Sequence, residues 1–128
     1  MLHTALWVDA AFELVAGAVL LLLAGSVANW LDADRAIVSI AGVIFLGASA
    51  AIAGFALQPA PARRTVSTLA ALNLIGGVAI WCVLPFVWSG ISGEGRWMAA
   101  AIADSFIAVA ALEFLALQRG APATGVTR

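Results

Sequence analysis

Four long apolar stretches constrain this chain more than any other feature of its sequence. They run from about residues 5–25, 36–57, 66–88 and 97–117, with short segments between them. Each stretch is close to the ~20 residues with which a helix crosses ~30 Å of hydrocarbon. None shows the two-residue alternation of a membrane strand. The sequence therefore predicts an all-α integral membrane protein, a four-transmembrane-helix bundle that forms a single membrane domain over residues 1–128.

The composition excludes the common classes of soluble protein. Of the 128 residues, 64% are hydrophobic and only 10% are charged, whereas about a quarter of a soluble domain is charged. A net charge of −1 offers no basic surface for nucleic acid. Cys82 and His3 are single, so an internal disulfide and a bis-histidine haem are both excluded. We expect no cofactor and, without a nucleophile–base pair, metal cluster or phosphate loop, no enzymatic activity.

The segments between the spans have the composition of connectors. Residues 29–35 include Asp32 and Asp34, either of which suits the N-cap of the second span. Residues 58–64 form a proline-stiffened turn, and residues 89–96 are predicted to be a flexible loop. A loose tail is predicted for residues 120–128.

The arginine residues predict the orientation. Four spans place both termini on one side of the membrane, and arginines are more frequent on that side: Arg63, Arg64, Arg119 and Arg128, against Arg35 and Arg96. The positive-inside rule then places both termini in the cytoplasm. The use of arginine without lysine, together with abundant alanine and glycine, is typical of high-GC bacteria. We therefore expect a multi-pass protein of the bacterial plasma (inner) membrane.

One alternative concerns the first span. Residues 14–24 also fit the apolar core of a signal peptide that is cleaved after Ala28, which would leave three spans. Signal peptides have a basic segment before this core, but here the acidic Asp9 and Glu13 precede it. We therefore interpret residues 5–25 as a membrane span.

Polar side chains within the spans are the informative ones, because a charged side chain at the bilayer centre costs ~2.5–3.5 kcal/mol on insertion scales. Small residues share the helix faces of several of these side chains and indicate helix–helix contact. We predict that these faces turn toward the bundle interior and form one polar track, ~6 to ~20 Å from the inner side. The residues of this track are Asp9, Glu13, Asn73, Asp104 and Ser105.

Two further features have more ordinary interpretations. Glu113 follows Asp104 by nine residues, on the opposite face of the helix and near its inner end. We expect its carboxyl to reach the membrane interface beside Arg119. Residues 47–54 contain the small-residue pairs Gly47/Ala51 and Ala50/Gly54. Such pairs fit an oligomer face or internal packing, and we favour internal packing.

No arginine lies within a span, so Glu13 and Asp104 have no obvious counter-ion. We expect both carboxyls to be largely neutral at pH 7 and hydrogen-bonded to Asn73, Ser105, backbone carbonyls or water. In the alternative interpretation the acids only join helices, although hydrogen bonds between membrane helices average only ~0.6 kcal/mol.

Several segments resemble known proteins. Asp9-Ala10-Ala11, Asn73 and residues 103–119 resemble small, functionally uncharacterised four-helix inner-membrane proteins of bacteria. Glu13 and Trp88-Ser89-Gly90 are similar, more weakly, to features of small multidrug resistance transporters. Those transporters use a first-helix glutamate to exchange protons for cationic drugs. The tripeptide here lies at the exit of the third span rather than within it, and the chain has no tyrosine, which that family uses in its binding chamber.

Two functions are consistent with these features. The first is a non-catalytic membrane component, either an accessory subunit or a homo-oligomer, whose partners are the lipid bilayer and a second copy or another membrane subunit. The alternative is a proton-coupled transporter of small cations or metabolites that uses the intramembrane acids.

Overall fold

The structure is a computed structural model that describes residues 1–119. Over these residues it is all-helical, with no strand. The helices are α1 (Leu2–Leu22), α2 (Ala24–Leu31), α3 (Arg35–Ala56), α4 (Arg63–Val87) and α5 (Gly93–Arg119). All except α2 are long and apolar enough to cross a membrane, which confirms that the four predicted stretches form helices of the expected length and apolarity. The tail predicted at 120–128 lies outside the described residues.

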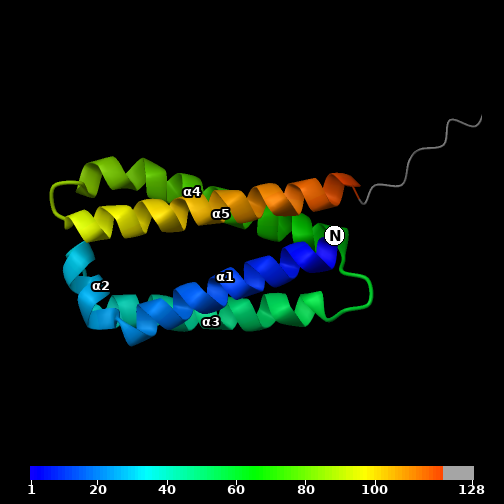
Figure 1. Cartoon of the computed structure of the whole chain (residues 1–128), viewed down its shortest axis with the longest axis horizontal. Coiled ribbons are helices and arrows are strands. Elements are labelled where there is room, and N and C mark those ends of the chain that lie inside the picture. The colour runs from blue at the N-terminus through cyan, green and yellow to red at the C-terminus, as the bar shows by residue number, and fades with distance from the viewer. Residues whose placement is uncertain (120–128) are drawn as a thin grey trace, which may run out of the picture.

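The four long helices run in alternating directions and form two pairs, α1 with α3 and α4 with α5 (Figure 1). Contacts between α1 and α5 join the two pairs. The beginning of α1 and the end of α5 lie at the same end of the bundle (Figure 1), as an even number of spans requires. We call this the inner end, after the predicted orientation, and the opposite end the outer end.

The first connector differs from the prediction. Helix α1 ends at Leu22, within the predicted span 5–25, and the separate short helix α2 includes residues 29–31, which we assigned to the connector. The helix breaks at Leu23, whose ψ of 22° departs from helical values. Helix α2 continues beyond this break because it buries apolar side chains within an outer apolar cluster formed by Leu20, Ala24, Val27, Ala28 and Val38.

The predicted helix cap is confirmed at one of its two candidates. Asp34 is the N-cap of α3, and its Oδ1 accepts a hydrogen bond of 2.6 Å from the amide of Ala36. Asp32 instead follows the end of α2 in a left-handed conformation, with φ of 50°. A short aspartate tolerates that conformation better than most residues do. The two acids therefore end one helix and begin the next.

The loop predicted at residues 89–96 is shorter in the structure, because α5 begins at Gly93. The first turn of α5 packs closely against the end of α2. A Cβ on Gly95 would collide with the carbonyl of Trp30. That carbonyl also accepts a hydrogen bond of 2.9 Å from the amide of Ser92. These contacts fix the outer ends of α2 and α5 to each other.

Each helix pair has one close crossing at a glycine. A Cβ on Gly17 of α1 would lie 2.9 Å from the carbonyl oxygen of Gly42 on α3. In the other pair, a Cβ on Gly77 of α4 would lie 2.7 Å from the carbonyl oxygen of Ala103 on α5. Small residues at these positions allow the backbones to approach, as in other membrane helix pairs.

The small-residue run of α3 is not one of these crossings. Gly47, Ala50, Ala51 and Gly54 are all exposed, and a Cβ on either glycine would meet no atom within 4 Å. The expectation of internal packing is therefore wrong for these pairs. Helix α3 instead packs on α1 through another face, whose buried residues are Val38, Gly42, Ser49, Ile52 and Ala56.

Candidate functional site

A layer of polar side chains lies inside the inner half of the bundle. An apolar cluster covers it on the side of the inner end, and the cluster consists of Leu6, Ala10, Ile52, Ala56 and Val66. All four long helices contribute to the polar layer. Its buried members are Asp9 and Glu13 of α1, Ser49 of α3, Asn73 of α4 and Glu113 of α5. The prediction that Asp9, Glu13 and Asn73 face the interior is confirmed.

The centre of this layer is formed by Asp9, Asn73 and Glu113. The Nδ2 of Asn73 donates a hydrogen bond of 3.2 Å to Oε2 of Glu113. The carboxyl of Asp9 lies beside both side chains. Asp9 and Glu113 each have 0% exposed surface, yet both oxygens of Asp9 and Oε1 of Glu113 have no hydrogen-bond partner among the described residues. Three carboxylate oxygens are therefore buried without the donors that buried acceptors normally have.

The position of Glu113 corrects the sequence interpretation. We expected its carboxyl to reach the interface beside Arg119, on the face opposite the site, but it is completely buried. The buried face of α5 includes Ala103, Val109, Ala110 and Ala116. Glu113 lies on this face because α5 packs on both α4 and α1. Its partner Asn73 is thus supplied by the neighbouring helix of its own pair.

Ser49 and Glu13 extend the polar layer on the side of α1. The Oγ of Ser49 donates a hydrogen bond of 2.7 Å to the carbonyl oxygen of Ala10 and so connects α3 to α1. Glu13 lies one helical turn from Asp9 toward the outer end and is 6% exposed. Residues from three helices form an aromatic cluster near Glu13. The ring of Phe106 lies 5.3 Å from that of Phe12 and 5.9 Å from that of Phe45.

Asp104 and Ser105 lie outside this layer, which corrects the predicted track. Asp104 is exposed on the outer surface of the α4–α5 pair. Its Oδ1 accepts a hydrogen bond of 3.0 Å from Nε1 of Trp81. The Oγ of Ser105 donates a hydrogen bond of 2.7 Å back to the carbonyl oxygen of Ala101 in its own helix. The expectation that Asp104 faces the bundle interior is therefore wrong.

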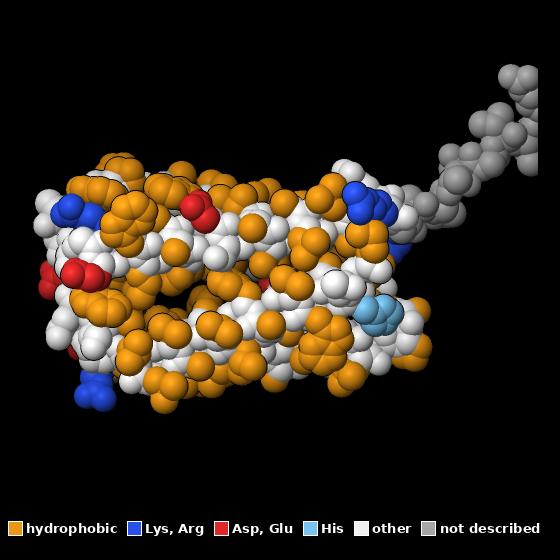
Figure 2. All heavy atoms as spheres, viewed as in Figure 1, with side chains coloured by type: hydrophobic (Ala, Val, Ile, Leu, Met, Phe, Trp, Pro, Cys, Tyr) orange, Lys and Arg blue, Asp and Glu red, His pale blue; other side chains and the backbone are white. Residues whose placement is uncertain are grey.

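The surface around Asp104 combines small residues with an aromatic groove. Ala101, Ala108 and Ala111 are exposed on the same face of α5, at the spacings of three and four residues that align side chains on a helix. Figure 2 shows an acidic side chain among hydrophobic ones on this pair, away from both ends. Toward the outer end lies a groove of about 370 Å³, lined in part by Trp81, Trp88, Trp97 and Arg96. We call this surface the Asp104 face.

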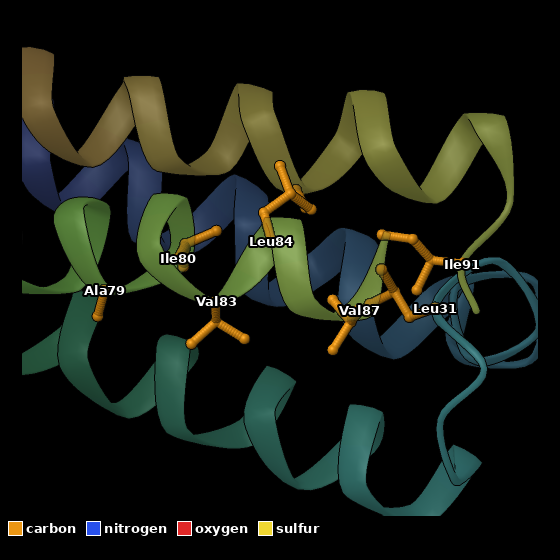
Figure 3. A pocket seen from close by; sticks show the side chains of 8 residues that line it. Leu31, Ala79, Ile80, Val83, Leu84, Val87 and Ile91 are labelled. Carbon is orange, nitrogen blue, oxygen red and sulfur yellow. The ribbon is translucent and has the colours of Figure 1, made fainter. Parts of the chain in front are cut away.

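Two other openings are lined almost entirely by hydrophobic side chains. A groove of about 370 Å³ lies on α4 toward the outer end, where Ala79 and Val83 point toward α3 (Figure 3). A crevice of about 190 Å³ separates α1 from α5, and Figure 2 shows the hollow between the two helix pairs. The crevice is lined by Phe12, which precedes Glu13 in sequence, by Ala16, three residues after it, and by Ser105. It is therefore the opening nearest to the polar layer along α1.

The chemistry of the polar layer is that of exchangeable protons rather than of a metal centre. Among residues 1–119, no group of three or more His, Cys, Asp or Glu side chains is arranged to hold a metal ion. The layer contains three carboxyls, one amide and the hydroxyl of Ser49, and a hydrogen bond between side chains joins Asn73 to Glu113. Carboxyl groups in such surroundings can accept, hold and pass on protons.

Sequence reasoning missed three residues that the structure brings into these sites: Glu113, Ser49 and Trp81. Glu113 shares its face with Ala110 and Ala116, so the small-residue criterion that selected Asp104 applies to it as well. Ser49 lies among the small residues of α3, and nothing in its own spacing indicates Ala10 as an acceptor. The sequence does carry a signal for Trp81. Its indole N–H lies within a predicted span and needs a hydrogen-bond acceptor there.

No protein-family model, curated protein or solved structure matches this chain. The two resemblances drawn from the sequence accordingly stay hypotheses, and the site is interpreted from its own geometry.

Proposed function

We propose that this chain is a non-catalytic, multi-pass protein of the bacterial inner membrane, and that it works as a homo-oligomer whose subunits meet at the Asp104 face. One observation carries the proposal: Asp104 exposes its carboxyl near the middle of a 27-residue apolar helix. A charged side chain facing lipid at that depth costs ~2.5–3.5 kcal/mol on insertion scales. Acidic residues at such positions almost always face protein or water rather than acyl chains.

The surroundings of Asp104 favour a helix from another subunit over lipid. The small side chains of Ala101, Ala108 and Ala111 leave no bulky group on either side of the carboxyl along the helix. A second helix can therefore approach this face closely. Trp81 already donates to one carboxyl oxygen, so the carboxyl is held in place on the surface. A symmetric dimer would bring two such faces together, because a two-fold interface uses the same patch on both subunits.

A second copy of this chain explains the face better than a basic partner does. Across a two-fold axis, a protonated Asp104 of one subunit donates to the ionised or neutral Asp104 of the other. This arrangement needs no cation, and the spans of this chain contain no lysine, arginine or histidine near that depth. The groove lined by Trp81, Trp88 and Trp97 would receive bulky side chains at the outer edge of the same interface.

Cysteine cross-linking in native membranes tests this proposal. The background is Cys82→Ser, because Cys82 is free and exposed. Ala108→Cys places a thiol on the Asp104 face, and Gly47→Cys places a matched thiol on the exposed small-residue surface of α3. We expect a covalent dimer with Ala108→Cys and only monomer with Gly47→Cys. Monomer in both, or a cross-link from Ala108→Cys to a different protein, would contradict the homo-oligomer.

A further inference from the structure

The three unpartnered oxygens in the bundle interior point to a ligand that supplies hydrogen-bond donors. Asp9 and Glu113 are fully buried side by side. Asn73 satisfies only Oε2 of Glu113, and both oxygens of Asp9 lack a partner. Buried polar atoms normally have a hydrogen-bond partner. The two carboxyls are therefore placed to bind a donor that the helices around them do not supply. This observation does not depend on the Asp104 face or on the oligomeric state.

We propose that Asp9 and Glu113 form a proton-binding carboxyl pair, with Glu13 as the neighbouring carboxyl through which protons reach the pair. When one proton is bound, the O–H of one carboxyl donates to an oxygen of the other. Asn73 holds Glu113 in place from the opposite side. Uptake transfers a proton from hydronium to a carboxylate oxygen, which forms an O–H bond and leaves a water molecule. Release is the reverse reaction.

The groups that face the pair favour a proton over a metal ion. Helix α1 contributes Asp9 and Glu13, and α5 contributes Glu113. The buried polar residues of α3 and α4 are the uncharged Ser49 and Asn73. A metal ion needs several converging oxygen ligands, but the described acidic side chains do not converge as such a group, and Asn73 presents its N–H₂ donor to the pair. A proton needs only two oxygens.

Glu13 connects the pair to the surface of the bundle. It lies four residues from Asp9, or ~6 Å along the helix axis. It retains 6% of its surface exposed, whereas Asp9 and Glu113 retain none. Phe12, which precedes Glu13, and Ala16, three residues after it, line the crevice between α1 and α5. On the side of the inner end, the apolar cluster with Leu6 and Val66 closes the layer. Glu13 is therefore the least buried of the three carboxyls and the one through which the proposal routes protons to the pair.

Infrared spectroscopy of the full chain in lipid vesicles tests the proposal. The background is Asp104→Asn, which removes the exposed carboxyl within the spans and leaves the interior unchanged, while the exposed Asp32, Asp34 and Glu94 contribute equally to every variant. We expect a carboxylic-acid C=O band that titrates with pH in sodium-free buffer. Glu113→Gln and Asp9→Asn should each change this band, and the double substitution should remove the contribution of the pair. Leu72→Ala, at an exposed position on α4, is the control and should leave the band unchanged.

Several results would overturn the proposal. A band that is unaffected by both Asp9→Asn and Glu113→Gln would show that the pair holds no proton. A band in the Asp104→Asn background that the exposed carboxyls of Asp32, Asp34 and Glu94 account for completely would show the same. This result needs no change to the interior, so it does not depend on how well the substituted interiors fold. Loss of the band on addition of sodium at constant pH would indicate a metal-ion site. Each of these outcomes can be interpreted even if the cross-linking experiment detects only monomer.

Discussion

Two acidic residues of the same helix have opposite surroundings. Glu113 is fully buried against α4 and α1 and accepts a hydrogen bond from Asn73. Asp104, nine residues earlier, is exposed on the outside of the bundle and accepts one from Trp81. Both share their faces with alanine residues. The comparison shows that small residues beside an acid mark a face that contacts another helix, but do not indicate whether that helix belongs to the same chain.

The two sites also share one support. Asn73 and Trp81 lie on α4 on either side of Gly77, where the backbones of α4 and α5 approach closely. Each donates to an acid on α5. The geometry of this crossing therefore determines both the interior bond and the exposed one. Changes to either acid should separate the two sites, whereas changes at the crossing should disturb both.

The largest expected effect comes from replacing the exposed acid. Asp104→Leu should make membrane insertion of α5 more favourable by about 3 kcal/mol, because an aspartate is exchanged for a leucine near the helix centre. Insertion can be measured in the full chain with a glycosylation-site reporter after α5. Glu113→Leu is the comparison within the same helix and should gain less, because it lies nearer the helix end and Asn73 loses its acceptor. Equal gains would remove the distinction between the two sites.

A smaller effect is expected at the shared crossing. Gly77→Ala should destabilise the folded protein by about 1–3 kcal/mol, the usual cost of overpacking, because the new Cβ would lie 2.7 Å from the carbonyl oxygen of Ala103. Unfolding in mixed detergent micelles, followed by circular dichroism, measures this change. Gly76→Ala is the matched control. A Cβ there meets no atom within 4 Å, so that variant should be neutral or slightly more stable. If Gly76→Ala were the more destabilising change, the crossing would be wrongly placed.

The smallest effects are the couplings within each hydrogen-bonded pair. A double-mutant cycle of Asn73→Ala and Glu113→Ala should give a coupling of about 1 kcal/mol, within the range measured between membrane helices. A cycle of Trp81→Phe and Asp104→Ala should give about 0.5 kcal/mol or less, because this bond is exposed. Both couplings come from unfolding free energies in the same micelles. A stronger coupling at Trp81–Asp104 would reverse the assignment of interior and surface.

Much of the architecture is predictable from the sequence. The lengths of the four apolar stretches determine four spans, because a helix must satisfy its backbone within the hydrocarbon. The periodicity of α1 also identifies the buried face of Asp9 and Glu13. Helix α2 could not be predicted in this way. Its eight residues form a helix where Val27 and Ala28 are buried in the outer apolar cluster, and that burial exists only in the folded chain.

The amino-acid sequence by itself determined that this chain forms four helices long and apolar enough to cross a membrane, which residues within them are polar, and that an aspartate at position 32 or 34 begins α3. The tertiary structure alone decided that Glu113 and Ser49 face inward, whereas Asp104 and Gly47 face outward. The physical reason is the solvent. In water, apolar residues identify the core, but lipid is as apolar as the interior of the bundle. Hydrophobic patterning therefore cannot distinguish the two sides of such a helix, and only packing between backbones selects the buried one.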